Sequence, residues 1–413
     1  MTSNTTSPTL NSNDDEGGER GQAARVFLGL KIKPVPAEFL LIASAALLLT
    51  IFGLVMVLSA SSASPTGPFD TFMKQGIFAL IGVPLMFVLS RFPMTFFKKM
   101  AWPILALALA LQSLIHSPLG VRNDGNTAWI QVGGFQLQPA EFLKIATAIW
   151  VGYVLYRKQS LLGMWRHVFI PLVPVSALIL GAVLSGEDLG STMILLMIIL
   201  SGLFFSGVRL RVFILPLVLG AIGVAVAAIL SPNRVGRILT VFSDCSSAAE
   251  YDAACYQPMH GVWGLASGGI FGLGLGNSKM KYEWLPAAQN DYIFAIVGEE
   301  LGLIGCLVVL ALFATFAVGA FRIVRRTPDP FVRIVSGSIA VWIVGQALIN
   351  IGVVLRLFPP LGVPLPFMSQ GGTSLLSVLI ACGVLLSFTR TLPELPASAL
   401  TAPMAPRRLT GHA

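Results

Sequence analysis

Charged side chains are scarce in this sequence. Asp, Glu, Lys and Arg make up 11% of its 413 residues, whereas a soluble globular chain carries about 25%. Hydrophobic residues reach 55% and the mean hydropathy is +0.80. The apolar residues lie in runs of roughly 17 to 25, the length that crosses a bilayer as a helix. These features exclude an ordinary soluble protein and predict an integral membrane protein.

Cysteine is also rare, with four residues in the chain. Cys306 and Cys382 fall inside apolar runs, where a packing role is expected. Cys245 and Cys255 lie together in a long loop, and a bridge between them would close a small hairpin if that loop faces an oxidising compartment. The sequence leaves open whether this structural disulfide forms.

Ten apolar runs predict an all-α polytopic fold with about ten transmembrane helices. They are residues 38–59, 75–90, 100–116, 139–156, 168–185, 191–207, 210–230, 292–320, 334–356 and 371–389. With the N-terminus inside, 19 of the 27 Lys and Arg residues fall on the cytoplasmic side, as the positive-inside rule requires. We therefore predict that both termini are cytoplasmic. The net charge of +8 reflects this topology, and no nucleic-acid partner is inferred from it.

The chain divides into three parts. Residues 1–35 are polar and predict a disordered cytoplasmic tail; so long a polar stretch before the first run argues against a cleavable signal peptide. Residues 36–390 form the membrane domain, in which 231–290 is a large extracytoplasmic loop between helices seven and eight. Residues 391–413 predict a second disordered cytoplasmic tail.

Four polar or Gly/Pro-rich segments gather on the predicted outer face, and two of them begin helices. In the first, Gln138, Glu141 and Lys144 recur every three residues and share one helix face. Glu141 and Lys144 form either a neutralising pair or a site where the lysine offers its charge to a phosphate. In the second, GEDLGST at 186–192, Asp188 either caps the next helix or holds a divalent cation or a sugar hydroxyl.

The third segment is the loop 231–290 and the helix that follows it. Its glycine-rich stretch has no preceding strand, so we do not assign a nucleotide-binding fingerprint to it. Lys279 and Lys281 add basic charge near the membrane surface. Asp291 lies where the loop becomes helix, as an N-cap or as a catalytic residue.

Two further carboxylates, Glu299 and Glu300, follow about two turns deeper in the same helix. A charge at membrane depth is costly and normally faces an interior cavity. We expect Lys144 or Arg356 as their partner, and a polar cavity that opens outward.

The fourth segment, 356–374, contains four prolines and three glycines, which exclude a regular helix. Its apolar side chains predict a re-entrant segment, because irregular backbone at membrane depth must be buried in protein or line a cavity. Ser369 and Gln370 would then face the same outward pocket.

With these motifs in order, the sequence resembles the SEDS proteins, the FtsW/RodA/SpoVE family. The resemblance covers about residues 38–390. Its motifs are SASS at 59–62, QPAEFLK at 138–144, EDLGST at 187–192, SGGIFGLGLGNS at 267–278, NDYIFAIVGEELG at 290–302 and GVPLPFMSQGGTSLL at 362–376. The last motif and GLGLGNS are more similar to the division branch, FtsW, than to RodA.

The resemblance implies a peptidoglycan glycosyltransferase of the bacterial plasma membrane that polymerises lipid II, the undecaprenyl-linked precursor, at the division septum. It implies as partners a class B penicillin-binding protein, which cross-links the strands, and other divisome membrane proteins. The family's catalytic aspartate maps onto Asp291. Lipid II is α-linked to its pyrophosphate and the product is β-1,4-linked, so the transfer inverts and needs one base.

No cofactor is certain from the resemblance, although charge on the pyrophosphate must be stabilised. Lys144, Lys281 or Arg356 would supply that charge, or a divalent cation (Mg or Mn) held by Asp291 and Asp188. We expect substrate contacts from the following residues: Gln138, Glu141, Lys144, Trp129, Asp188, Lys281, Glu299, Arg356 and Ser369.

Three positions depart from the family pattern. The family's RRWI stretch reads TAWI at 127–130, which loses basic contacts but keeps Trp129. Gln289 replaces a histidine two residues before the aspartate, and Gln370 replaces a tyrosine. Three other functions remain open: a lipid II flippase, a division scaffold without chemistry, and a RodA-type elongation polymerase. A flippase predicts ionisable residues through the full membrane depth and inverted repeats, and the sequence has neither.

Overall fold

The computed structural model describes residues 35–393, except 64–66, 124–125 and most of 230–254. Within 230–254 only Gly236, Ile238, Ser243 and Cys245 are described. The predicted N-terminal and C-terminal tails, and most of the first half of the loop 231–290, therefore lie outside the described residues.

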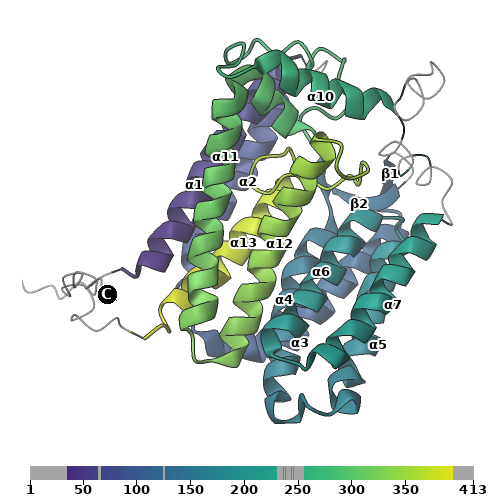
Figure 1. The fold of residues 1–413 in the computed structure, drawn as a ribbon, viewed down its shortest axis with the longest axis vertical. Coiled ribbons are helices and arrows are strands. Elements are labelled where there is room, and N and C mark those ends of the chain that lie inside the picture. The colour runs from purple at the N-terminus through teal and green to yellow at the C-terminus, as the bar shows by residue number, and fades with distance from the viewer. Residues whose placement is uncertain are drawn as a thin grey trace, which may run out of the picture. The chain divides into compact units, whose positions relative to one another are not determined.

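Each of the ten predicted apolar runs coincides closely with a helix of at least 18 residues in the described part of the chain. These helices are α1 (Ala37–Ala60), α2 (Pro68–Leu89), α3 (Met94–Ser113), α4 (Pro139–Arg157), α5 (Trp165–Leu184), α6 (Leu189–Ser206), α7 (Leu210–Ile229), α11 (Ile293–Arg326), α12 (Pro330–Val354) and α13 (Gly372–Thr389). They run side by side in Figure 1. A shorter helix, α10 (Tyr256–Gly268), lies across their upper end in that view.

Seven of these helices, α1, α2, α3, α6, α11, α12 and α13, are long and apolar enough to cross a membrane. Two of the others have a visible reason for falling short: α4 carries Glu141 and Lys144, and α5 is interrupted at Ile170, where φ is −107° and ψ is 115°. The seven helices make the chain a multi-pass membrane protein.

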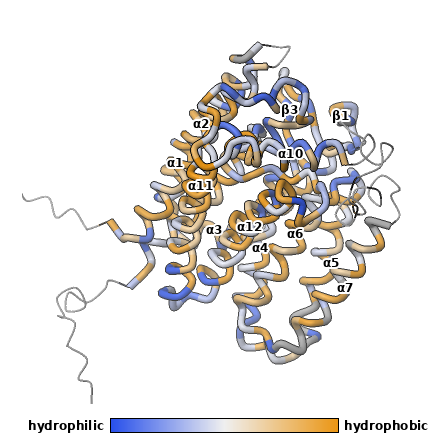
Figure 2. Tube along the Cα trace, turned by 45° about the horizontal axis from the view of Figure 1, so that its top comes forward, coloured by the Kyte–Doolittle hydropathy of each residue, from blue (hydrophilic) through white to orange (hydrophobic). Residues whose placement is uncertain are grey.

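The helices are hydrophobic over most of their length, and hydrophilic residues gather at their ends and in the connecting loops (Figure 2). Large apolar side chains remain exposed on the helix surfaces; Leu80 on α2 is 76% exposed and Leu107 on α3 is 63% exposed. A helix that is apolar on its outer face as well is typical of a membrane span.

The all-α prediction is wrong between α3 and α4, where three antiparallel strands form a small sheet. Its strands are β1 (Gly120–Asn123), β2 (Asn126–Val132) and β3 (Phe135–Leu137), in the order β1-β2-β3. Gly133 and Gly134, with φ of 56° and 84°, form the two-residue turn that suits the twist of a β-hairpin. Trp129 on β2 is half-buried and pairs with Val121 on β1.

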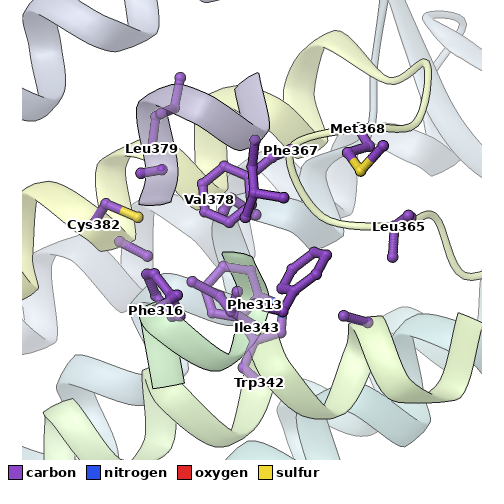
Figure 3. Packing of buried hydrophobic residues seen from close by; sticks show 14 of the residues in the cluster. Phe313, Phe316, Trp342, Ile343, Leu365, Phe367, Met368, Val378, Leu379 and Cys382 are labelled. Atoms are coloured by element: carbon purple, nitrogen blue, oxygen red, sulfur yellow. The ribbon is translucent and has the colours of Figure 1, made fainter. Parts of the chain in front are cut away.

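The irregular segment between α12 and α13, residues 355–371, is packed inside the helices. Phe367 lies 6.3 Å and 6.0 Å, between ring centroids, from Phe313 and Phe316 on α11. Met368 is fully buried and approaches α1 closely at Gly53, where a Cβ atom would lie 2.6 Å from the Met368 Cα. Figure 3 shows Phe367 and Met368 among side chains of α11, α12 and α13. The predicted irregular, buried backbone is therefore present.

Candidate active site

Asp291 lies in the turn that leads into α11. The helix begins at Ile293 with Tyr292 at its N-cap, so Asp291 precedes the cap position itself. The residue is half-buried. Its carboxylate faces segment 355–371, since Oδ2 lies 3.8 Å from the point that a Cβ on Gly362 would occupy.

A side chain from α12 holds this turn. The amide nitrogen of Asn350 donates to the main-chain carbonyl of Asp291 at 2.7 Å and to that of Val363 at 2.8 Å. Asn350 is 1% exposed. One buried amide therefore ties the backbone of Asp291 to segment 355–371.

Segment 355–371 also binds the two residues before Asp291. The Ser369 hydroxyl donates to the carbonyl of Asn290 at 2.5 Å and accepts from the N–H of Leu365 at 2.8 Å. The N–H of Gln370 donates to the carbonyl of Gln289 at 2.8 Å. The predicted site residue Ser369 is thus beside Asp291 in space, and its hydroxyl braces the turn.

Three buried amide oxygens around this turn have no hydrogen-bond partner among the residues that the structure describes: Asn290 Oδ1, Asn350 Oδ1 and Gln370 Oε1. A buried acceptor left unpaired costs about 1–3 kcal/mol, so such a group needs an explanation. Each can accept a hydrogen bond from a hydroxyl or ligate a hard divalent cation. Their residues adjoin Asp291 in the chain or belong to the elements that brace its turn.

The predicted pair of Glu141 and Lys144 is present, 2.8 Å apart, and both side chains are 1% exposed. Ser377 on α13 donates to Glu141 at 3.1 Å, and Lys144 donates to Gln346 on α12 at 3.3 Å. Gln346 in turn donates to the carbonyl of Pro364 at 2.8 Å. The pair joins α4, α12 and α13 below segment 355–371, which favours the structural alternative for Lys144.

Asp188 caps α6, since its side chain accepts from the N–H of Ser191 at 2.9 Å. Its other oxygen accepts from the side chain of Gln138 at 2.8 Å, and the N–H of Gln138 donates to Thr373 on α13 at 3.2 Å. Of the two alternatives for Asp188, the structure contains the cap.

Glu299 and Glu300 are both fully buried. Glu299 accepts from the Ser278 hydroxyl and from the N–H of Lys279 at 2.8 Å. This carboxylate therefore holds the loop before α11. The prediction from the sequence that it lines an outward cavity is wrong.

The prediction that Lys144 or Arg356 pairs with these carboxylates is wrong. Glu300 is paired with Lys281, at 3.4 Å, and accepts from Ser59 at the end of α1 at 2.7 Å. The partners come from a loop 19 residues earlier and from a helix 241 residues earlier.

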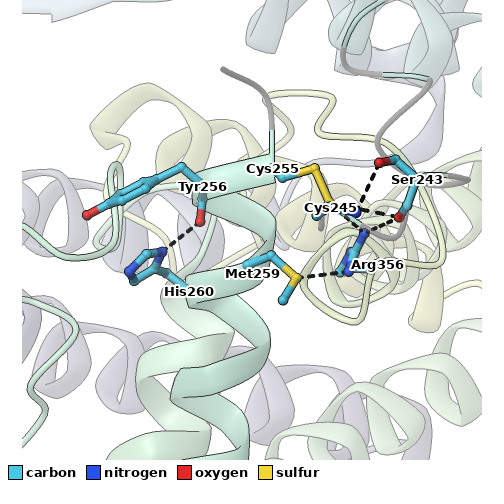
Figure 4. Close-up of a disulfide and its surroundings, with 7 residues drawn as sticks. All are labelled: Ser243, Cys245, Cys255, Tyr256, Met259, His260 and Arg356. Atoms are coloured by element: carbon cyan, nitrogen blue, oxygen red, sulfur yellow. Dashed lines mark hydrogen bonds between the residues drawn. A yellow bond between two sulfur atoms is a disulfide. The ribbon is translucent and has the colours of Figure 1, made fainter. Parts of the chain in front are cut away.

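Arg356 lies instead beside a disulfide between Cys245 and Cys255 (Figure 4). Its guanidinium donates to the carbonyl of Ser243 at 3.0 Å and contacts the sulfur of Met259 at 2.9 Å. Arg356 therefore links the end of α12 to the outer loop and to α10.

Two residues of this site, Gln346 and Asn350, were not identified from the sequence. They are one helical turn apart within an otherwise apolar run, and amides at that depth are a signal of function or of internal bonding. Among the described residues no group of three His, Cys, Asp or Glu side chains could hold a metal ion.

Comparison with known proteins identifies similar chains. A family model described as cell cycle protein, FtsW/RodA/SpoVE, matches residues 39–393. The probable peptidoglycan glycosyltransferase FtsW of Mycobacterium tuberculosis is 36% identical over 367 residues, covering 88% of this chain and 69% of that protein. The corresponding FtsW of Trichlorobacter lovleyi is 35% identical over 353 residues, covering 84% of this chain and 92% of that protein.

Two solved structures share the fold. A chain in a peptidoglycan synthase complex that coordinates polymerization and crosslinking has a TM-score of 0.69 and 22% identity, covering 84% of this chain and 96% of its own length. The rod shape determining protein RodA of Thermus thermophilus has a TM-score of 0.62 and 20% identity, covering 86% of this chain and 97% of its own length.

Proposed function

The chain belongs to the FtsW/RodA/SpoVE family of cell cycle proteins, and on that premise we propose that it is a peptidoglycan glycosyltransferase polymerising lipid II into β-1,4 glycan strands. The observation that carries the proposal is the position of Asp291. It stands at the start of α11 in a turn braced by Asn350 and Ser369, within a domain that the family matches from end to end.

Asp291 is the proposed general base. Inverting transfer requires one group to remove the proton from the attacking 4-hydroxyl of the acceptor sugar, while the pyrophosphate leaves from the opposite face. Asn350 and Ser369 fix the backbone of the turn, so the carboxylate meets the hydroxyl in one orientation. The undecaprenyl chain of the substrate stays in the bilayer, which explains a catalyst built among membrane helices.

The developing charge on the pyrophosphate needs a positive partner. The three predicted cations already have contacts: Lys144 with Glu141, Lys281 with Glu300, and Arg356 with the carbonyl of Ser243 and sulfurs near the disulfide.

We therefore favour a divalent cation, Mg or Mn, over these side chains. The oxygens of Asp291, Asn290, Asn350 and Gln370 fit such an ion, because the unpaired amide oxygens are the ligand type that hard cations prefer. Bound there, the ion would neutralise charge on the leaving group. Asp188 is left out of this set because Ser191 and Gln138 bind its two oxygens.

Ten spans with both tails in the cytoplasm form the topological part of the proposal. Arg326, at the end of α11, bonds Glu38 at the start of α1 at 2.6 Å and the carbonyl of Pro393 at 2.7 Å. Residues near the two ends of the described chain therefore lie at the same end of the helices, as an even number of crossings requires. The opposite end of the helices carries α10 (Figure 1), and Asp291 would face outward there.

A class B penicillin-binding protein and the division septum complete the proposal. Support comes from the FtsW names of the relatives and from the synthase complex whose fold is shared. Depletion of the protein in cells separates division from elongation. Loss of a division polymerase yields filaments or chains of undivided cells, whereas loss of an elongation polymerase yields shortened or rounded cells.

Polymerisation of lipid II tests the activity directly. The purified protein and its cognate penicillin-binding protein would be mixed with fluorescent lipid II, and glycan length would be read on a gel. The partner alone is the control, because any polymer that it makes must be subtracted. Glycan formed only with both proteins supports the enzyme. Transfer of lipid II across vesicle membranes without glycan would replace the proposal with the flippase.

A further inference from the structure

Helix α11 is broken near its outer end. Gly302 has φ of 66° and ψ of −163°, values outside the helical range. The break frees main-chain groups on both sides, and the glycine-rich loop 269–276 pairs with them. Four hydrogen bonds join the two backbones: Leu273 N–H to Glu299 C=O (2.9 Å), Gly274 N–H to Glu300 C=O (3.0 Å), Leu303 N–H to Gly269 C=O (2.9 Å) and Ile304 N–H to Ile270 C=O (3.3 Å).

Glycines make this approach possible. A Cβ atom on Gly272 would overlap the carbonyl of Glu300, and one on Gly302 would overlap the carbonyl of Ile270. The same holds at the end of α10, where a Cβ on Gly268 would overlap the carbonyl of Gly298. The glycine-rich motif therefore serves backbone packing against the broken helix.

The side chains of loop 269–276 turn outward and are apolar. Ile270 is 59% exposed, Phe271 81% and Leu275 56%. Directly below the break, Leu303 and Leu307 on α11 are 53% and 54% exposed. Because Ile304 bonds Ile270, the loop and this face of α11 form one continuous apolar surface.

The length of α11 sets the depth of this surface. The nearest charge below the break is Arg322, and residues 303–321 carry none. A helix needs about 20 residues to cross the hydrocarbon layer, so a layer that starts at Arg322 ends close to Gly302. The loop 269–276 therefore lies at the outer edge of the hydrocarbon layer.

We propose that loop 269–276 inserts into the outer leaflet and binds lipid acyl chains. Membrane insertion requires the polar groups of irregular backbone to be bonded within the protein, and the pairing with α11 bonds four of those of the loop. Tyr282 and Trp284, 58% and 57% exposed, follow the loop as the aromatic residues typical of a membrane interface. The inserted loop bonds the main chain of Glu299 and Glu300, and Ser278, in the segment that follows the loop, bonds both carboxylates.

Lipid fits this surface better than a protein partner does. Residues 267–278 carry no charge, whereas a protein interface normally has a polar rim. The surface is also continuous with a face of α11 that a membrane span presents to lipid. The inference concerns the bilayer and does not depend on the catalytic role of Asp291.

Spin-label accessibility in lipid bilayers tests the proposal. Nitroxides would be attached to Phe271→Cys, to Leu307→Cys as the lipid-facing reference, and to Lys279→Cys as the aqueous reference. Lys279 is exposed and lies on the same connecting segment. The two free cysteines, Cys306 and Cys382, are buried, and unmutated protein carried through labelling provides the blank.

Oxygen concentrates in the hydrocarbon and a nickel chelate remains in water, so their collision rates report the environment of each label. At positions 271 and 307 we expect the label to collide more often with oxygen than with the nickel chelate. At position 279 we expect the reverse order. A label at 271 that behaves like the one at 279 would place the loop in water and overturn the proposal. A label at 271 shielded from both reagents would mean that protein covers the surface, which also overturns it.

Discussion

The side-chain amide of Asn350 on α12 donates to the main-chain carbonyl of Asp291 at 2.7 Å and, in parallel, to that of Val363 at 2.8 Å. The candidate base is thus held against segment 355–371 by the side-chain nitrogen of a buried residue on a neighbouring helix. Asn350 and Asp291 are 59 residues apart in the chain. This bridge makes the position of the base depend on how α12 packs.

Asn350→Ala tests this bridge. The variant leaves two carbonyls without their donor, and each costs about 1–3 kcal/mol if it stays buried. Displacement of the turn by about 1 Å would lower the polymerisation rate up to about 100-fold. Because Asn350 acts through Asp291, kcat should fall more than KM changes. Thr315→Val is the control, since that hydroxyl donates within α11, to the carbonyl of Ala311. Full activity of Asn350→Ala would show that the bridge is dispensable.

Variants of the buried pair of Glu141 and Lys144 distinguish a structural role of Lys144 from a role in binding phosphate. Lys144→Met leaves a buried carboxylate alone and should destabilise the protein by about 3–5 kcal/mol. Adding Glu141→Gln removes that charge and should restore much of the thermal stability. If the pair is structural, the double variant keeps most of its polymerisation activity. A folded double variant with a strongly raised KM for lipid II would instead assign Lys144 to the substrate.

The disulfide between Cys245 and Cys255 should stabilise the outer loop. Its sequence separation of 10 closes a short loop, for which chain entropy gives about 3 kcal/mol. Reduction should therefore lower the Tm of the purified protein. The same reductant applied to a Cys245→Ser, Cys255→Ser double variant should cause no further shift. An unchanged Tm in the unmutated protein would show that the bond adds no stability.

Gly302→Ala tests the break in α11. The substitution combines a φ of +66° with overlap against the carbonyl of Ile270. Gly276→Ala is the control, because its φ of +83° is also positive and strains a side chain, but no atom lies within 4 Å of the new Cβ. Gly302→Ala should lower the Tm clearly more than Gly276→Ala does. Equal shifts in Tm would mean that loop 269–276 moves away from the new side chain without a loss of stability.

The sequence allowed prediction of the helices and of local pairs. Long apolar runs predicted all ten long helices of the described chain, because membrane spans need continuous apolar length. Glu141 with Lys144 and the cap at Asp188 were also accessible, since each depends on residues three positions apart. The sheet around Trp129 was missed, although the Gly133-Gly134 turn signalled a hairpin.

Long-range partners were beyond prediction. Glu300 finds Ser59 across 241 residues, and helical periodicity does not reveal which helices are neighbours. Charge alone suggested Lys144 or Arg356, but the nearer loop supplied Lys281. The bracing of Asp291 by Asn350 likewise depends on the packing of α12 beside α11.

Comparison of Asp291→Asn with the unmutated protein tests the central claim most directly. The amide keeps the size of the side chain and removes the base, whose loss typically costs about 10²–10⁴-fold in rate. Glycan polymerisation from lipid II would be measured with the cognate penicillin-binding protein, alongside the Tm and lipid II binding of each protein. We predict that the variant folds and binds lipid II but makes no glycan above background. Glycan at the rate of the unmutated protein would contradict the assignment of Asp291 as the catalytic base.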